Sequence, residues 1–406
     1  MTVQDNIRIP RPLAVAIGFL LTFNVYLLPW SAQTPRATDV IGATFLVIVV
    51  ALLLMGLRLS QRSGARILVV AILLFPMFWH GLLIGQLNAL IDAFRWVIGF
   101  GWALGLTWMA RNNRLRSAVF KGFIIGTVGC VGVIIMQAIG LIELTVSLGW
   151  APQDAVVGAF FAGILRVPGV EANVNGSAAV FSFCVPVALG LLNEGRAGRI
   201  WFLIAVATVT LGSAITFNRS SMLVSGVTIA AWMFSSGQKS VRTRWKVLTV
   251  LIIIGGFVTF GPPGGWERWD ELSNLGQSGN FRVRSISTLF GLDLLYQNPL
   301  GTGKVYQTYI ENYMRSKMEH GTTHSPHNAL IQLGLMAGIP LVIWVIWKLG
   351  IRAVSLFRRG SVESLLSLHL LGLFFFEAYF AVPTVISLTA WLAIQPLAHR
   401  SFSNAN

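Results

Sequence analysis

Residues 118–142 read AVFKGFIIGTVGCVGVIIMQAIGLI, and this stretch decides the fold class. Lys121 is its only charged residue, and an α-helix needs about 20 apolar residues to cross the hydrocarbon layer of a bilayer. The whole chain has the same character, because 55% of its 406 residues are hydrophobic and 11% are charged. Soluble domains carry about a quarter charged residues. The composition therefore excludes a soluble enzyme or a disordered chain and predicts an all-α integral membrane protein.

Similar apolar runs recur along the chain and predict about 12 transmembrane helices. Together they form a single polytopic membrane domain over residues 1–406. The first run is expected to stay as an uncleaved span, because no small-residue cleavage site follows it. The predicted helices are 13–30, 40–57, 66–85, 89–109, 118–142, 174–192, 199–215, 221–235, 246–261, 326–347, 363–380 and 382–398.

The positive charges alternate along the chain and predict its orientation. If the N-terminus is cytoplasmic, the inside segments hold 20 of the 30 Lys and Arg residues and the outside segments hold nine, with Arg95 inside a span. The positive-inside rule then places both termini in the cytoplasm. Because topology explains the formal charge of +15, we expect no nucleic-acid partner. Cys130 and Cys184 lie in apolar runs and are expected to be buried packing residues.

Two outer loops are long enough to have structure of their own. The first covers about 143–173, and the second, 262–325, is a large periplasmic loop between the ninth and tenth predicted helices. Apolar residues at helical spacing predict a helix over Val283–Gln297 within the second loop. This helix should end at Asn298-Pro299, because proline disfavours helix in the residue before it.

Several arginines are candidates for binding an anion. Arg219 lies in a very short outer connection, where positive residues are disfavoured, so it either binds an anion or extends to the membrane surface. Arg282 and Arg284 lie at the start of the predicted loop helix, and arginine suits a diphosphate because its planar fork makes paired hydrogen bonds. A solvated loop charge is the alternative for each. Arg95 either pairs with Asp92, one turn earlier, or helps to hold the anion.

The segment Thr323-His324-Ser325-Pro326-His327-Asn328 opens the tenth predicted helix. Ser325 is a plausible N-cap, and Pro326 suits the first helical position. His327 would then lie in the first turn, where the helix dipole disfavours a charged imidazole. A neutral histidine is ready to accept a proton, as a general base must. The alternative is a polar residue at the membrane surface.

The three histidines of this region also suggest a metal site, which we disfavour. His320, His324 and His327 would need a helix to bring the first two together, yet Gly321 and Pro326 interrupt the segment. Zinc sites also use Cys, Asp or Glu ligands, and Glu319 is the nearest carboxylate. The sequence therefore predicts neither a metal nor a cofactor.

The order of these motifs resembles the O-antigen ligase/O-antigen polymerase (Wzy-type) superfamily of bacterial membrane glycosyltransferases. Asn218-Arg219-Ser220-Ser221 is followed by Arg284, by the Asn-Pro-Leu-Gly-Thr-Gly run at 298–303, and by His327-Asn328-Ala329-Leu330. The resemblance covers about residues 210–345 in motif detail. The family often has Trp one turn after the loop arginine, whereas this chain has Thr288, so the choice between Arg282 and Arg284 stays open.

The resemblance implies a GT-C-like, metal-independent, inverting glycosyltransferase of the bacterial inner membrane, with its active site facing the periplasm. Its donor would be a glycan on undecaprenyl diphosphate, and its acceptor a sugar hydroxyl. Arg219 and Arg284 would hold the diphosphate, and His327 would activate the acceptor. Further substrate-binding candidates are Arg282, Arg95, His324 and Asn328.

We expect the acceptor to be lipid A-core, which makes the protein an O-antigen ligase of lipopolysaccharide assembly. The alternative is a polymerase of O-antigen or exopolysaccharide repeats, with a growing glycan as acceptor. A flippase or transporter of lipid-linked oligosaccharides is a further alternative. A flippase should distribute cations over several spans, whereas here they gather on one side, which favours an enzyme. The remaining expected partners are membrane lipids.

Overall fold

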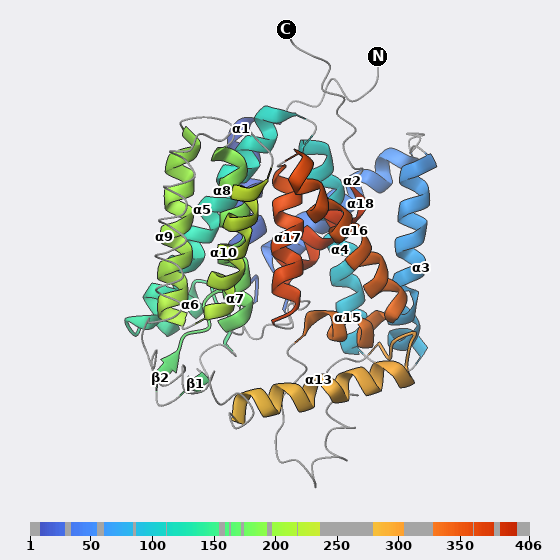
Figure 1. Ribbon diagram of the computed structural model, residues 1–406. Helices are drawn as coiled ribbons and strands as arrows, with labels where there is room; N and C mark the ends of the chain where they lie inside the picture. The colour runs from blue at the N-terminus through green and yellow to red at the C-terminus, as the bar shows by residue number, and fades with distance from the viewer. Residues whose placement is uncertain are drawn as a thin grey trace, which may run out of the picture.

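The structure is a computed structural model of the chain (Figure 1). The residues that it describes are 9–28, 34–54, 61–83, 87–110, 112–153, 159–161, 164–171, 174–192, 197–216, 218–235, 279–303, 328–359, 361–376 and 382–395.

The described chain is almost entirely helical. The helices are α1 (Arg11–Thr22), α2 (Ala37–Leu54), α3 (Gln61–Leu83), α4 (Leu87–Ala110), α5 (Asn113–Ala138), α6 (Ile142–Ser147), α7 (Val174–Ser182), α8 (Cys184–Leu192), α9 (Ala197–Thr216), α10 (Arg219–Phe234), α13 (Gly279–Gln297), α15 (Ala329–Ala337), α16 (Ile339–Arg359), α17 (Val362–Phe374) and α18 (Pro383–Ile394). Before α7, the short strands β1 (Ala159–Phe161) and β2 (Ile164–Arg166) form an antiparallel hairpin.

Helix α5 shows why these sequences pack as a bundle. It lies against α1 with the two backbones in close contact. A Cβ atom on Gly122 would lie only 1.9 Å from the carbonyl oxygen of Val15, and one on Gly18 would lie 2.0 Å from that of Val119. Small residues that permit such an approach are typical of helix pairs in membranes. A larger side chain at Gly122 would force the two helices apart.

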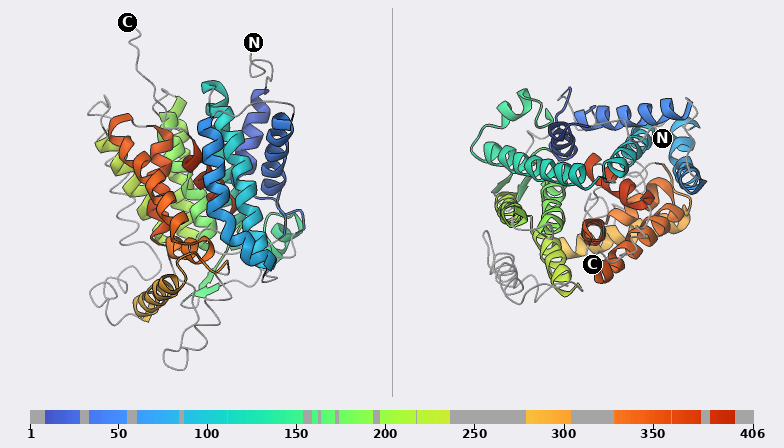
Figure 2. Two further views of the ribbon diagram at one scale, coloured as in Figure 1. Left: turned by 90° about the vertical axis from the view of Figure 1, so that its right-hand side faces the viewer. Right: turned by 90° about the horizontal axis from the view of Figure 1, so that it is seen from above.

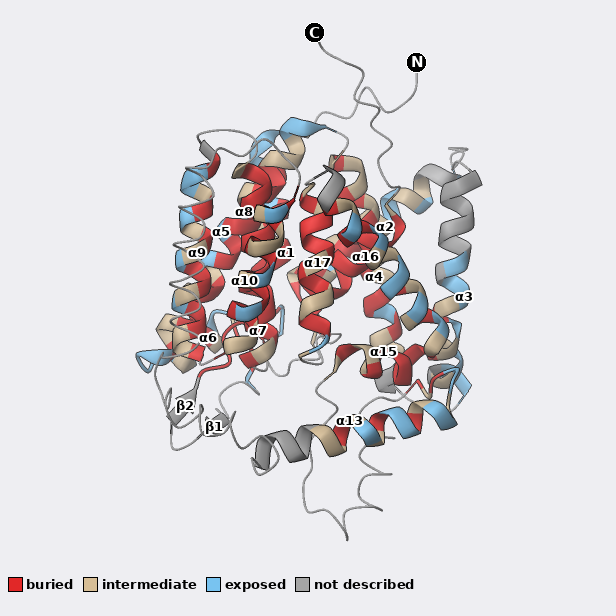
Figure 3. Cartoon of the chain, viewed as in Figure 1, coloured by how far each residue is buried: buried red, intermediate tan, exposed pale blue. Residues whose placement is uncertain are grey.

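The outer surface of the bundle is apolar. Exposed hydrophobic side chains occur along several helices, including Ile125 at 43% exposed, Leu203 at 63% and Val354 at 64%. Figure 3 shows exposed residues on the outer faces of the helices and buried residues between them. Apolar exposure on this scale is unfavourable in water but not in lipid, so the helices form a membrane protein.

Five stretches among the described residues are long and apolar enough to cross a membrane. They are Leu90–Ala110, Asn113–Ala138, Val174–Leu192, Gly198–Thr216 and Ile339–Leu356. Shorter apolar helices occupy the first three and the last two predicted regions, and α10 occupies the eighth. The ninth region, 246–261, lies outside the described residues. The count of 12 spans therefore stays a prediction.

The first and sixth predicted helices differ from the structure in an informative way. The first was expected over 13–30, but α1 ends at Thr22, and Tyr26 forms an isolated antiparallel bridge with Arg36. Tertiary pairing thus replaces helix where hydropathy alone would continue it. The sixth, 174–192, is interrupted at Phe183, between α7 and α8. Pro186 lacks the amide hydrogen that would bond to the carbonyl of Ser182, so the helix breaks there.

The helices have two distinct ends (Figures 1 and 2). Helix α13 lies across one end of the bundle, which we call the α13 end. Helices α7, α10 and α15 begin at this end, whereas α1, α5 and α9 begin at the opposite end. The structure therefore brings the beginnings of several helices together at the α13 end. The sequence predicts the helix Val283–Gln297, and α13 begins four residues earlier, at Gly279.

Candidate active site

Arg219 is the first residue of α10, and the residue before it determines this position. Asn218 has extended backbone angles, and its side-chain oxygen accepts a hydrogen bond from the Ser221 amide at 3.0 Å. The Ser220 hydroxyl donates to the same oxygen at 2.9 Å. Asparagine is among the preferred N-cap residues for this reason. Asn218 thus begins the helix so that a half-buried Arg219 lies in its first turn.

Two neighbouring helices hold the start of α10 in place. The side-chain amide of Asn218 donates to the side-chain oxygen of Asn175, in the first turn of α7, at 2.8 Å. The hydroxyls of Ser221 and Ser213, the latter on α9, lie 3.0 Å apart. These contacts fix the position of Arg219 relative to α7 and α9. A binding group needs such support to hold a ligand in one geometry.

Helix α13 carries Arg282 and Arg284 near its beginning. Its residues Ser287, Gly291 and Leu294 are buried and lie on one helical face, since they are spaced by four and three. The position of Arg284 precedes Ser287 by three residues and Gly291 by seven, so it shares this face. Arg282 is two residues from Arg284, about 200° around the helix, and belongs to the opposite face. The side chains of both arginines lie outside the described part of the structure.

The beginning of α15 corrects the prediction for the histidine segment. We expected Ser325 as N-cap and Pro326 as the first helical residue, but the helix begins at Ala329 with Asn328 as its N-cap. The Asn328 side-chain oxygen accepts from the amides of Leu330 at 2.9 Å and Ile331 at 3.2 Å. His327 therefore precedes the N-cap instead of lying in the first turn. The argument that the helix dipole keeps it neutral from within the helix is wrong.

The predicted span 326–347 is also divided, because α15 ends at Ala337 and α16 starts at Ile339. Between them Gly338 has φ +91°, a conformation that other residues rarely adopt. The run at 298–303 packs against this junction. The Thr302 amide donates to the carbonyl of Leu335 at 2.7 Å, and the Ile339 amide donates to that of Pro299 at 2.8 Å.

Backbone geometry explains why the run at 298–303 contains two glycines. Gly301 has φ +82°, and a Cβ atom there would lie 2.6 Å from the Gly338 nitrogen. Gly303 has φ +66°, and a Cβ atom there would lie 2.4 Å from the Cβ atom of His80, at the end of α3. Only glycine fits both the backbone angle and the close approach. The run therefore ties the end of α13 to α15 and α3.

Arg95 lies on α4 and is 9% exposed. Its guanidinium lies 3.8 Å from the carboxylate of Asp92, one turn earlier. The structure thus contains the ion pair that the sequence offered as one of two alternatives. A role of Arg95 in holding an anion stays a prediction.

Sequence reasoning missed a buried ion pair. Arg36, just before α2, and Glu171, just before α7, are joined by a hydrogen bond of 2.7 Å, with side chains 2% and 3% exposed. Burial by itself would lower the pKa of Arg36, but the charge of Glu171 and its hydrogen bond raise that pKa above the ordinary value. Asn24 donates to the other Glu171 oxygen at 2.6 Å. The sequence offers no signal for this pairing, because each of the two outer loops contains more than one charged residue.

The three candidate histidines of the site lie outside the described residues: His320, His324 and His327. The proposed base and the alternative metal cluster both stay untested predictions. Within the described part of the chain, no group of three or more His, Cys, Asp or Glu residues is arranged to hold a metal ion.

The fold and the site together define an α-helical membrane protein in which Arg219 and the beginnings of several helices lie at one end. Residues 202–346 match the family model described as O-antigen ligase. Over this segment the chain is similar to the O-antigen ligase/polymerase superfamily, whose members are glycosyltransferase-like enzymes. The comparison with curated proteins gives no match. The matched segment runs from α9 into α16 and includes every predicted site residue except Arg95.

Proposed function

We propose that this protein is an O-antigen ligase that transfers a glycan from undecaprenyl diphosphate to a sugar hydroxyl of lipid A-core at the periplasmic face. The family match over 202–346 carries the proposal. It is supported by the α13 end, where Arg219 begins α10 and the helix that bears Arg284 crosses the bundle. The similarity to this family implies a lipid-linked glycan and an acceptor as substrates.

The proposed orientation of the protein in the membrane depends on the distribution of positive charge. A cluster of cations lines the opposite end of the bundle, at the beginnings of α1 and α5. Positive residues favour the cytoplasmic side, so we assign that end and both termini to the cytoplasm. The α13 end then faces the periplasm, where lipid-linked glycans would be transferred.

Arg219 and Arg284 are the proposed diphosphate ligands. A helix N-terminus attracts anions because its amide hydrogens are unpaired and its dipole is positive there, and Arg219 adds a bidentate cation at that point. We choose Arg284 over Arg282 because its position belongs to the buried face of α13. As the bond to the diphosphate breaks, two arginines would neutralise the negative charge that develops on it, which lowers the barrier.

His327 is the proposed general base. It would take the proton of the acceptor hydroxyl while the oxygen attacks the anomeric carbon from the side opposite the diphosphate, which inverts the centre. The choice depends on the family resemblance and on its place directly before the cap of α15. The side-chain oxygen of Asn328 caps α15. A contact of this residue with substrate would therefore come from its side-chain NH2 group. Arg95 and His324 are proposed as secondary substrate contacts, and no metal takes part.

The product distinguishes ligase from polymerase. The purified protein in proteoliposomes should join one glycan to lipid A-core when it receives that acceptor and an undecaprenyl-diphosphate-linked donor. Lengthened glycan that stays on undecaprenyl diphosphate, with or without lipid A-core, would instead identify a polymerase. Movement of intact donor across the bilayer without either product would identify a flippase. Arg199→Gln, an exposed cation at the start of α9, is the matched control for Arg219→Ala.

A further inference from the structure

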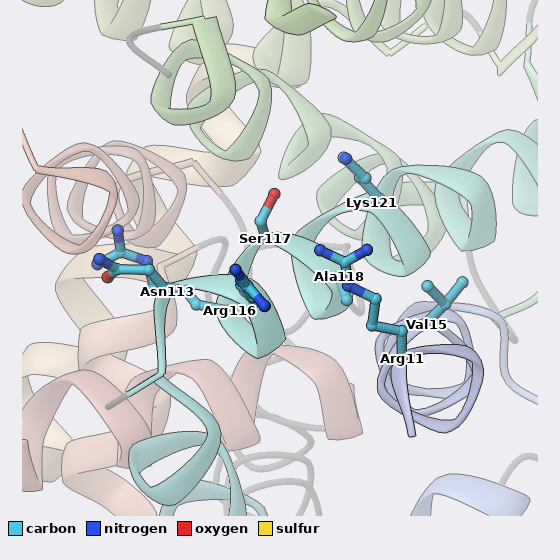
Figure 4. A pocket seen from close by; sticks show the side chains of 8 residues that line it. Arg11, Val15, Asn113, Arg116, Ser117, Ala118 and Lys121 are labelled. Atoms are coloured by element: carbon cyan, nitrogen blue, oxygen red, sulfur yellow. The ribbon is translucent and has the colours of Figure 1, made fainter. Parts of the chain in front are cut away.

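A cavity of about 640 Å³ lies at the end of the bundle opposite α13, between α1 and α5 (Figure 4). Cations dominate its lining, and no carboxylate occurs among its described lining residues. The lining residues are Arg11, Val15, Asn113, Arg114, Arg116, Ser117, Ala118 and Lys121. Four positive side chains in one cavity repel one another, and an anion bound among them would relieve this cost.

The packing of α1 on α5 keeps these cations together. The Val15 carbonyl lies against Gly122 so closely that a Cβ atom there would be 1.9 Å away. Figure 4 shows Arg11 extending from α1 toward α5, so that cations from both helices border the same cavity. At the start of α5, the Asn112 side-chain oxygen accepts from the Arg114 amide at 2.9 Å and fixes the first turn. The cavity is thus built by rigid elements.

The positive-inside rule accounts for cations in cytoplasmic segments. It does not require that the cations of α1 and those of α5 line the same cavity. Such cavities between transmembrane helices on the cytoplasmic side suit anionic lipid headgroups. The phosphate could belong to a lipid or to a soluble anion, and the surface below the cavity favours the lipid.

Helix α5 continues below the cavity as an apolar, exposed stripe. Lys121, Ile125 and Val128 lie on one face, since their spacing is four and three. Ile125 is 43% exposed and Val128 is 42% exposed, while Leu13 on α1 is 50% exposed. A phospholipid has the same order of parts, because its phosphate lies at the membrane surface and its acyl chains extend into the bilayer. We propose that this cavity binds the phosphate headgroup of an anionic glycerophospholipid, with an acyl chain along this stripe.

Native mass spectrometry of the full chain in a neutral detergent tests the proposal. Phosphatidylglycerol and phosphatidylcholine are titrated separately, and phosphatidylglycerol should bind more tightly. A charge near the surface contributes about 1 kcal/mol, which is about five-fold in affinity. The triple variant Arg11→Gln/Arg116→Gln/Lys121→Gln should therefore lose about 100-fold in affinity for phosphatidylglycerol. Arg199→Gln, an exposed cation at the same end, should leave that affinity unchanged.

A single substitution keeps the proposal testable if the triple variant does not fold. Lys121→Gln alone should lose about five-fold in affinity, and Lys121→Arg should restore it because the charge returns. Equal binding of the two lipids, or unchanged phosphatidylglycerol binding in both the triple and the single variant, would overturn the proposal. Inorganic phosphate that displaces phosphatidylglycerol at the same concentration would show a site for soluble anions and would also overturn it. None of these residues belongs to the proposed transfer site, so the result is independent of the ligase assay.

Discussion

Glu171→Gln is expected to destabilise the fold because it removes the charge that compensates buried Arg36. The two side chains are 2% and 3% exposed and are joined at 2.7 Å. Glutamine has nearly the same shape but one side-chain oxygen in place of two, so it can accept from Asn24 or from Arg36 but cannot present an oxygen to each. The substitution therefore removes the charge and one acceptor while it keeps the packing.

Removing one partner of a buried ion pair costs about 3–5 kcal/mol, because the other charge stays buried without compensation. Because the variant loses the charge and one of the two acceptors, the loss should lie within this range, about 3–5 kcal/mol. The effect should extend to the active site. Glu171 lies three residues before the start of α7, and Asn175 in the first turn of α7 holds the cap of α10 at 2.8 Å. The variant should therefore lose transfer activity as well as stability.

The free energy of unfolding can be measured in mixed micelles by raising the fraction of denaturing detergent and following tryptophan fluorescence. Glu143→Gln is the matched control, since Glu143 is exposed in the first turn of α6, and it should change that free energy by less than about 0.5 kcal/mol. The double variant Arg36→Gln/Glu171→Gln should be more stable than the sum of the single effects predicts. A loss below about 1 kcal/mol for Glu171→Gln, or strict additivity, would refute the reasoning.

Three further predictions concern the active site. Arg219→Ala and Arg284→Ala should each reduce glycan transfer in proteoliposomes by about 10²–10³-fold, and lysine should restore little because it lacks the bidentate fork; full activity in both alanine variants would exclude the arginines from the mechanism. His327→Ala should reduce the rate by about 10²–10⁴-fold and His324→Ala much less, whereas equal losses together with inhibition by a chelator would support a metal cluster. Asn218→Ala should lower the free energy of unfolding by about 1 kcal/mol, and Asn218→Asp, which keeps the cap, should lose less; equal losses would contradict the capping role.

The sequence alone determined the class of fold and supplied the candidate residues of the site. Apolar runs such as 118–142 have to be helical in a bilayer, because each backbone polar group must find its partner within the segment. The length of an apolar run located α10, and the helical spacing of apolar residues located α13, each to within a few residues. Arg219 was identified as a candidate because a cation in a short outer connection is costly. All these inferences use only the residue types and their spacing within one segment of the chain.

The tertiary structure decided what depends on residues far apart in the chain. Arg36 and Glu171 are separated by 135 positions, and no local pattern pairs them. The hydropathy of 23–28 predicts more helix, yet the bridge from Tyr26 to Arg36 ends α1 early. Asn328 and Ser325 are both acceptable caps by residue type, and the structure begins α15 after Asn328. The run at 298–303 packs on the α15–α16 junction through backbone contacts that only the folded chain creates. Local sequence patterns do not predict these features, because the free energy that stabilises them comes from packing and pairing between distant segments.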